Sequence, residues 1–317
     1  MSAAPKAAPP MASLYAGSAN TWECDEMGHL NVRFHVARAQ EGLGLLGLLA
    51  GMEDVFGRHA RATLLPLDQH IRFLKEVRPG EPLTMVGGVT GITETEATVY
   101  LELRHGDGSP ASTFHTKVAH VEPHGMRAFP WSARVRRGLE AFSVTLPKHG
   151  APRSIDVQTP PHPRASLAEA QRLGAHRIGA GLVAPDQTDA FGRLRPELFI
   201  GRVSDAAPNL LYEWRRAVAQ STTAQEGPIG GAVVEYRLVY RSWPRLGAAV
   251  EIHSGVIAVH GQTHRLAHWL LDPITGEAYG TTEAVALTFD LATRKAVQPP
   301  PAQLKALEAL LAPGMSA

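Results

Sequence analysis

The chain has 317 residues, of which 44% are hydrophobic and 19% are charged, and its formal net charge is +1 at pH 7. This length suits about two ordinary domains with a real apolar core, and the near-zero charge argues against a general nucleic-acid or membrane binder. Cys24 is the single cysteine, which excludes an intramolecular disulfide and favours a reducing, cytoplasmic compartment.

The first half of the chain predicts one domain over residues 13–122. The preceding residues 1–12 are rich in small residues and proline, lack the apolar core of a secretory signal and predict a disordered lead-in. Residues 13–23 predict a strand and its exit, and residues 31–52 predict a mostly apolar helix. Strand-like patterns follow at 69–76, 83–92, 97–105 and 112–121. Several glycines in the helix indicate close packing against a flat element such as a sheet.

The second half repeats this order after a proline-rich linker over residues 123–166, in which a short basic helix is expected. The second domain is expected over residues 167–297, with a helix at 197–219 that Pro208 starts or kinks. Its strands are predicted at 176–183, 234–241, 250–259, 265–271 and 279–289. An amphipathic helix and a tail complete the chain at 298–317.

The two halves also match residue by residue at a constant offset. The matched pairs are Asp25 with Asp189, Gly28 with Gly192, Leu30 with Leu194, Arg38 with Arg202, and Glu41 with Asp205. Any two α+β halves can be aligned to some degree by a choice of gaps, so chance alignment stays open as an alternative. The repeated order of strand, polar motif, helix and strands favours a true internal repeat.

The polar motif before the first long helix carries a resemblance to a known family. Its sequence is Asp25-Glu26-Met27-Gly28-His29-Leu30-Asn31. This segment resembles the Asp-x-x-Gly-His-x-Asn pattern of the hotdog-fold acyl-CoA and acyl-carrier-protein thioesterases. The resemblance implies an α+β fold of two hotdog domains in tandem. Each domain would be a long central helix wrapped by an antiparallel sheet, and the two would pair as an intramolecular pseudo-dimer.

Thioester hydrolysis requires a base or nucleophile, and hydrogen-bond donors where the carbonyl oxygen becomes an oxyanion. The resemblance assigns the role of base or nucleophile to Asp25, and His29 and Asn31 would orient the carbonyl or the water. Gly28 would let the substrate approach the backbone closely. Unpaired N–H groups at the helix start, near Gly28 and His29, would polarise the carbonyl. Glu41, farther along the helix, is a second acid candidate at the substrate.

Each residue of the motif also has a structural alternative. Aspartate caps helices well, so Asp25 could serve as an N-cap, and Asn31 could equally be the helix cap itself. His29 could be a solvated loop residue. The second copy keeps Asp189 but has Arg193 where the first has histidine. That copy is either degenerate, or it is a substrate-binding wall in which Arg193 and Arg195 contact the phosphates of coenzyme A. We favour one working site, built by Asp25.

Several other patterns are weak signals. Residues 42–47 fit G-x-G-x-x-G literally, but no buried strand precedes them, so a dinucleotide site is not expected. The apolar run at 43–52 is too short to span a bilayer. His260, His264 and His268 lie in a strand-like region without cysteine partners, so no metal site is expected. Cys24 lacks an arguable triad, and no G-x-S-x-G sequence occurs.

The sequence therefore predicts a thioesterase that hydrolyses an acyl-CoA or acyl-carrier-protein substrate. It predicts no cofactor except coenzyme A as part of the substrate, no nucleic-acid or membrane partner, and a possible homo-oligomer of the pseudo-dimer. A non-catalytic acyl-CoA-binding hotdog protein is the main alternative. An enoyl-thioester hydratase is disfavoured because that family spaces its aspartate and histidine more widely than Asp25 and His29.

Overall fold

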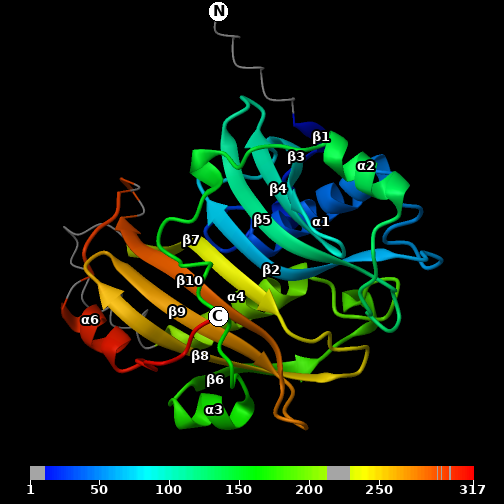
Figure 1. Cartoon of the computed structure of the whole chain (residues 1–317). Helices are drawn as coiled ribbons and strands as arrows, with labels where there is room; N and C mark the ends of the chain where they lie inside the picture. Colours follow the sequence, from blue (N-terminus) through cyan, green and yellow to red (C-terminus); the bar gives the residue numbers. More distant parts are fainter. Residues whose placement is uncertain (1–10, 213–228, 291, 294, 300) are drawn as a thin grey trace, which may run out of the picture. The chain divides into compact units, whose positions relative to one another are not determined.

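The computed structural model describes residues 11–212, 229–290, 292–293, 295–299 and 301–317. The chain divides into two compact units, Met1–Ala151 and Pro152–Ala317. Figure 1 draws the first unit in blue to green and the second in green to red. The division falls inside the segment that the sequence predicts as a linker.

Within the part of the chain that the structure describes, the first unit is a five-stranded sheet with one long helix. Its elements are β1 (Ala12–Ser18), the 3-10 helix η1 (Thr21–Glu23), α1 (Val32–Leu49), β2 (Thr63–Phe73), β3 (Pro82–Ile92), β4 (Glu96–His105) and β5 (Pro110–Val121). The strands pair in the order β1-β3-β4-β5-β2, and every pair is antiparallel. Figure 1 shows α1 lying across these strands.

α1 begins at a capping side chain and ends at a glycine. Oδ1 of Asn31 accepts a hydrogen bond from the N–H of Arg33 at 2.9 Å, and Gly51 beyond the helix has a φ of 96°. A Cβ at Gly42 would lie 2.5 Å from Sδ of Met85 on β3. Glycine at this position therefore lets the helix lie directly on the sheet, as the glycines of the segment predict.

The segment that follows β5 packs against the rest of the first unit. It forms α2 (Ala133–Ala141) and the 3-10 helix η2 (Lys148–Gly150). Nε2 of His149 lies 2.6 Å from Oε2 of the buried Glu102, and the carbonyl of His149 accepts a hydrogen bond from Nη1 of Arg72 at 2.9 Å. Much of the predicted linker is thus part of the first unit.

The second unit repeats the order of elements of the first. It contains α3 (Leu167–Arg172), β6 (His176–Leu182), the 3-10 helix η3 (Pro185–Gln187), α4 (Glu197–Leu210), β7 (Ile229–Tyr240), β8 (Ala249–His260), β9 (Thr263–Leu271), β10 (Ala278–Asp290) and α6 (Pro301–Glu308). The strands pair antiparallel in the order β7-β10-β9-β8-β6. Each unit therefore has the helix and antiparallel sheet of the predicted fold class. The pairing of the units as a pseudo-dimer stays a prediction.

The helix expected at 197–219 is α4 as far as Leu210, and its expected continuation from residue 213 onward lies outside the described residues. Pro208 lies inside the last turn of α4, not at its start. α3 and the C-terminal residues add a small apolar cluster to this unit, in which Ala170 and Met315 pack with the fully buried Trp269. Nε1 of Trp269 donates a hydrogen bond to the carbonyl of Ser316 at 2.8 Å.

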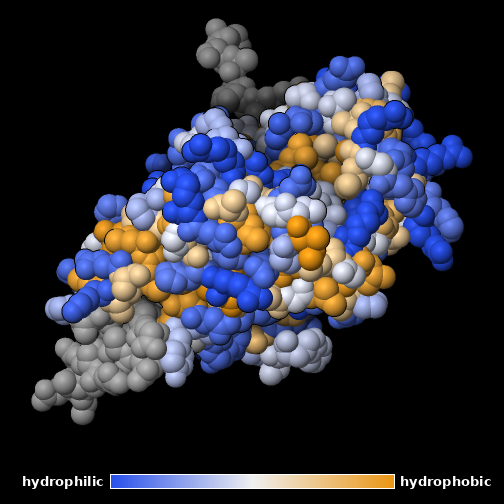
Figure 2. Space-filling view, turned by 90° about the horizontal axis from the view of Figure 1, so that it is seen from below, coloured by the Kyte–Doolittle hydropathy of each residue, from blue (hydrophilic) through white to orange (hydrophobic). Residues whose placement is uncertain are grey.

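Figure 2 shows one face of the molecule, on which apolar patches alternate with hydrophilic ones. Among the described residues, no helix is both long and apolar enough to cross a membrane.

Candidate active site

The predicted motif forms a tight loop between η1 and α1. An isolated bridge joins Cys24 to Leu30, and the N–H of Asp25 donates to the carbonyl of His29 at 2.9 Å. Gly28 donates to the carbonyl of Asp25 at 3.0 Å and has a φ of 73°, which favours glycine at this position. The loop brings the side chains of Asp25 and His29 to the start of α1.

The carboxylate of Asp25 is held by one of its two oxygens. Oδ1 accepts hydrogen bonds from the N–H groups of Met27 at 2.9 Å and of His29 at 3.2 Å. Oδ2 accepts none from the residues that the structure describes. Asp25 is not the cap of α1, because Asn31 performs that role. The arrangement fixes the carboxylate while leaving one oxygen to act on a water or a carbonyl carbon.

Two backbone donors expected at this loop are already used within it. The N–H of Gly28 is bonded to the carbonyl of Asp25, and the N–H of His29 is bonded to the carboxylate of Asp25. The expectation that these two amides are unpaired is therefore wrong, and their role at a substrate carbonyl stays a prediction. The N–H groups of Leu30 and Asn31 donate to the carbonyls of Val77 and Glu23. Val32 is the first helical residue, and the amides of a helix's first turn generally lack an intrahelical partner.

His29 lies against a carboxylate that no sequence motif indicates, that of Glu76. Its Nε2 is 3.1 Å from Oε2 of Glu76, and its side chain is 12% exposed. Glu76 follows β2, and the guanidinium of Arg78 is 3.8 Å from the same carboxylate oxygen. The N–H of Leu30 donates to the carbonyl of Val77 at 2.8 Å, so a backbone bond holds the two segments together. Nothing local to Glu76 in the sequence signals this contact.

A buried ion pair ties the loop to α1. Nη2 of Arg38 donates to Oε1 of Glu23 at 2.6 Å, and Nη1 of Arg38 donates to Oε1 of Glu41 at 2.9 Å. Oε2 of Glu23 in turn accepts from the N–H of Asn20 at 3.0 Å, which closes η1. The structure thus places Glu41 on Arg38 and not on Asp25.

Cys24 is poorly suited to nucleophilic attack. Its burial raises the pKa of the thiol, and the negative charges of Asp25 and Glu23 raise it further. A raised pKa keeps the sulfur protonated, whereas the thiolate is the nucleophile.

The second copy of the motif repeats the backbone of the first. The N–H of Asp189 donates to the carbonyl of Arg193 at 2.7 Å, and Gly192 has a φ of 74°. Oδ1 of Asp189 accepts from the N–H groups of Phe191 and Arg193, both at 2.9 Å. The N–H of Leu194 donates to the carbonyl of Pro244 at 2.8 Å, as Leu30 does to Val77.

The side chains of the second copy differ from those of the first. Nε and Nη2 of Arg193 both lie 2.8 Å from Oδ2 of Asp189, and Arg193 is only 3% exposed. The guanidinium carbon of Arg193 is 5.7 Å from the ring centroid of Trp243. Nε of Arg195 lies 3.1 Å from Oε1 of Glu197. Both predicted substrate-binding arginines therefore face carboxylates of their own unit.

The weaker sequence signals have structural explanations. Residues 42–47 lie inside α1, so they form no phosphate loop. His264 and His268 are buried strand residues, and their burial lowers the pKa of each to about 4. His268 is bonded through Nδ1 to Oγ of Ser254 at 2.7 Å. Among the residues that the structure describes, no three side chains are grouped to hold a metal ion.

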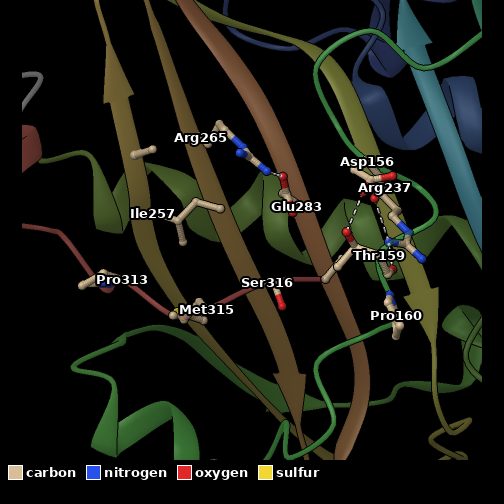
Figure 3. Close-up of a pocket in the computed structure, with 13 residues that line it drawn as sticks. Asp156, Thr159, Pro160, Arg237, Ile257, Arg265, Glu283, Pro313, Met315 and Ser316 are labelled. Atoms are coloured by element: carbon tan, nitrogen blue, oxygen red, sulfur yellow. Dashed lines mark hydrogen bonds and ion pairs between the residues drawn. The ribbon is translucent and has the colours of Figure 1, made fainter.

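A pocket of about 280 Å³ lies elsewhere, against the strands of the second unit (Figure 3). Nη1 of Arg237 donates there to the carbonyls of Asp156 at 3.3 Å and Thr159 at 2.8 Å. Arg265 donates to Glu283 from the neighbouring strand. These groups bond to residues of the same unit, and no predicted site residue lines the pocket.

Comparison with known proteins supports the predicted family. Residues 19–139 match the family model of the Thioesterase-like superfamily. This span contains the loop of Asp25, α1 and the strands β2 to β5. No curated protein matches the chain in sequence.

Solved structures are similar over most of the chain. A Lactobacillus plantarum protein described as an oleoyl thioesterase is 12% identical, with a TM-score of 0.66, over 89% of this chain and 98% of its own. The 12:0-ACP thioesterase of Umbellularia californica is 11% identical, with a TM-score of 0.64, over 87% and 93%. An acyl-ACP thioesterase of Bacteroides thetaiotaomicron is 13% identical, with a TM-score of 0.57, over 86% and 96%.

The structural neighbours show the fold of the chain, and the family match covers most of its first unit. The predicted α+β hotdog fold is confirmed, and the repeated order of elements in the two units supports the predicted tandem arrangement. The unit that carries Asp25 matches a thioesterase-like family model, which supports the predicted class of enzyme, a thioester hydrolase.

Proposed function

We propose that the chain hydrolyses an acyl-CoA or acyl-carrier-protein thioester at the loop of Asp25. The observation that carries the proposal is the asymmetric bonding of this carboxylate. Two backbone amides hold Oδ1, and no described residue donates to Oδ2. A fixed carboxylate with one open oxygen has the geometry that a general base or a nucleophile requires.

Two routes use the same oxygen. As a base, Oδ2 takes a proton from water while the water oxygen attacks the thioester carbon. The C–S bond then breaks and the thiolate takes up the proton. As a nucleophile, Oδ2 attacks the carbon itself, which releases the thiolate and leaves a mixed anhydride that water hydrolyses. Single turnover in ¹⁸O-labelled water tests for the nucleophilic route, because water attack on the carboxylate carbon of that anhydride leaves ¹⁸O in Asp25, which the base route never labels.

His29 and Glu76 are proposed to assist this step. The carboxylate of Glu76, 3.1 Å from Nε2, is proposed to orient the imidazole as an ion-pair partner. The ring can then direct its other nitrogen toward the water or the carbonyl. The N–H of Val32, at the first turn of α1, is the proposed donor to the developing oxyanion. This chemistry uses groups of the chain alone, with coenzyme A or the carrier protein as part of the substrate.

The carrier of the acyl group, coenzyme A or acyl-carrier protein, is the next part of the proposal. Two structural neighbours are described as acting on acyl-ACP or 12:0-ACP, which supports testing carrier-protein substrates beside acyl-CoA. A cytoplasmic location and further self-association remain part of the proposal.

The test is release of free thiol from a panel of short, long and aromatic acyl-CoA and acyl-carrier-protein substrates. The wild type is expected to release thiol from at least one of them, and Asp25→Asn is expected to lose this activity. Binding without release across the panel would favour the non-catalytic alternative. Loss of an enoyl-CoA's double bond without thiol release would identify a hydratase.

A further inference from the structure

The loops of Asp25 and Asp189 differ in how many hydrogen-bond donors contact the aspartate carboxylate. An ionised carboxylate offers roughly four lone-pair positions. Asp189 receives two backbone N–H groups on Oδ1 and the Nε–H of Arg193 on Oδ2, and Nη2 of Arg193 also lies 2.8 Å from Oδ2 as an ion pair. Asp25 receives only the two backbone donors on Oδ1. One arginine therefore accounts for the difference between an open and a saturated carboxylate.

The surroundings of Arg193 show that it is built into this position. Its guanidinium carbon lies 4.9 Å from the ring centroid of Phe191 and 5.7 Å from that of Trp243. Arginine stacks well on aromatic faces, so these rings hold the guanidinium over the carboxylate. The low exposure of Arg193, 3%, leaves little room for a second anion at its donors.

Trp243 occupies the position that Glu76 has in the first loop. Leu30 donates to the carbonyl of Val77, and Leu194 donates to the carbonyl of Pro244. The residue before the accepting carbonyl is Glu76 in one case and Trp243 in the other. The exchange of histidine for arginine is thus matched by the exchange of its carboxylate partner for a ring. A glutamate there would compete with Asp189 for the guanidinium.

We propose that the second loop is a masked acid site, in which Arg193 occupies the oxygen of Asp189 that corresponds to the reactive oxygen of Asp25. Because both oxygens of Asp189 are bonded, and Oδ2 is paired with a cation, neither oxygen is open to take a proton or attack a carbon. Arg193 therefore determines that the chain has one reactive carboxylate at its two equivalent loops. Only the reactivity ascribed to Asp25 rests on the proposed function. The masking of Asp189 is a property of the second unit alone.

The test compares the two aspartates within one molecule. The folded, full-length protein is treated with a water-soluble carbodiimide and glycine methyl ester, and the labelling rates of Asp25 and Asp189 are measured by mass spectrometry of peptides. In the wild type, Asp189 is expected to label at least about tenfold more slowly than Asp25, the factor that corresponds to one charge-assisted hydrogen bond. Arg193→His, which installs the residue of the first loop, is expected to bring Asp189 to a rate near that of Asp25.

Arg193→Lys is the matched variant, since it keeps the charge but loses the planar fork. It is expected to label at an intermediate rate. Equal labelling of both aspartates in the wild type would overturn the proposal without any variant. So would continued protection of Asp189 in a folded Arg193→His protein. If Asp25→Asn still released thiol at the wild-type rate, the proposed function would fall while the labelling ratio of Asp189 stayed informative.

Discussion

Nε2 of His29 lies 3.1 Å from Oε2 of Glu76, and this approach joins the motif before α1 to the chain that leaves β2. The neighbouring backbone bond from Leu30 to Val77 keeps the two side chains in register. The proposed site therefore includes a residue from a distant part of the sequence.

Glu76→Gln is expected to lower kcat by about 10- to 100-fold with little change in KM, because misplaced catalytic groups cost rate and not substrate affinity. Steady-state thiol release measures both constants. Glu96→Gln is the matched control, since Glu96 also pairs with a cation, Lys117 at 2.8 Å, on the same unit. Glu76→Asp should recover part of the lost rate. Equal kcat for Glu76→Gln and wild type would remove Glu76 from the mechanism.

Substitution by asparagine should affect different properties at the two equivalent aspartates: turnover at Asp25 and stability at Asp189. Asp25→Asn is expected to lower kcat by about 10² to 10⁴, the range for loss of a general base. Asp189→Asn should keep kcat close to the wild-type value but lower the melting temperature. The Asp189→Asn side chain turns an NH₂ group, which cannot accept, toward the buried guanidinium of Arg193. A buried donor left without an acceptor costs about 1–3 kcal/mol of folding free energy. Loss of turnover in Asp189→Asn alone would move the working site to the second unit.

The loops and the repeat could be predicted because their determinants are local. Aspartate and glycine at fixed spacing define the turn, and Gly28 and Gly192 both adopt the positive φ that the turn requires. Asn31 is recognisable as a cap for the same reason. Glu76 and Trp243 are not recognisable, because only tertiary structure brings them to the loops.

The element boundaries show a similar limit. β2 begins at Thr63, whereas the sequence predicts a strand only from residue 69. Pro66 argues against a strand there, but the register with β5 shifts between Pro66 and Asp68, so a bulge accommodates the proline. The segment around His149 reads as a linker because its partner Glu102 belongs to a separate strand. Residue propensity alone predicts neither the pairing of β2 with β5 at Pro66 nor the contact of His149 with Glu102.

Arg38 is expected to support both stability and activity. Arg38→Met leaves Glu23, which is 5% exposed, without its cation. Breaking such a buried pair costs about 3–5 kcal/mol, and it loosens the turn that precedes Asp25. Urea unfolding should report the loss of stability, and kcat should fall in the fraction that remains folded. Arg136→Met removes the exposed pair of Arg136 with Glu140 and should change stability by less than about 0.5 kcal/mol. Similar effects of the two substitutions would contradict a special role for Arg38.

Acid should destabilise the protein through its buried histidines. Burial lowers the pKa of His35, His264 and His268 to about 4 from the ordinary 6.5. The unfolded chain therefore binds more protons than the folded chain between these values. The free energy of unfolding should be unaffected by these groups above pH 6.5, fall as the pH drops toward 4, and level off below it. Each histidine contributes at most about 3 kcal/mol to this fall.

His268→Asn tests this dependence, because asparagine can still bond Ser254 but does not titrate in this range. Urea unfolding at a series of pH values should show a shallower slope for His268→Asn than for the wild type, with a loss of about one third of the slope that the three histidines produce. His124→Asn, at an exposed histidine, should leave the slope unchanged. A wild-type free energy that stays flat between pH 6.5 and 4 would show that these histidines are not held neutral by the fold.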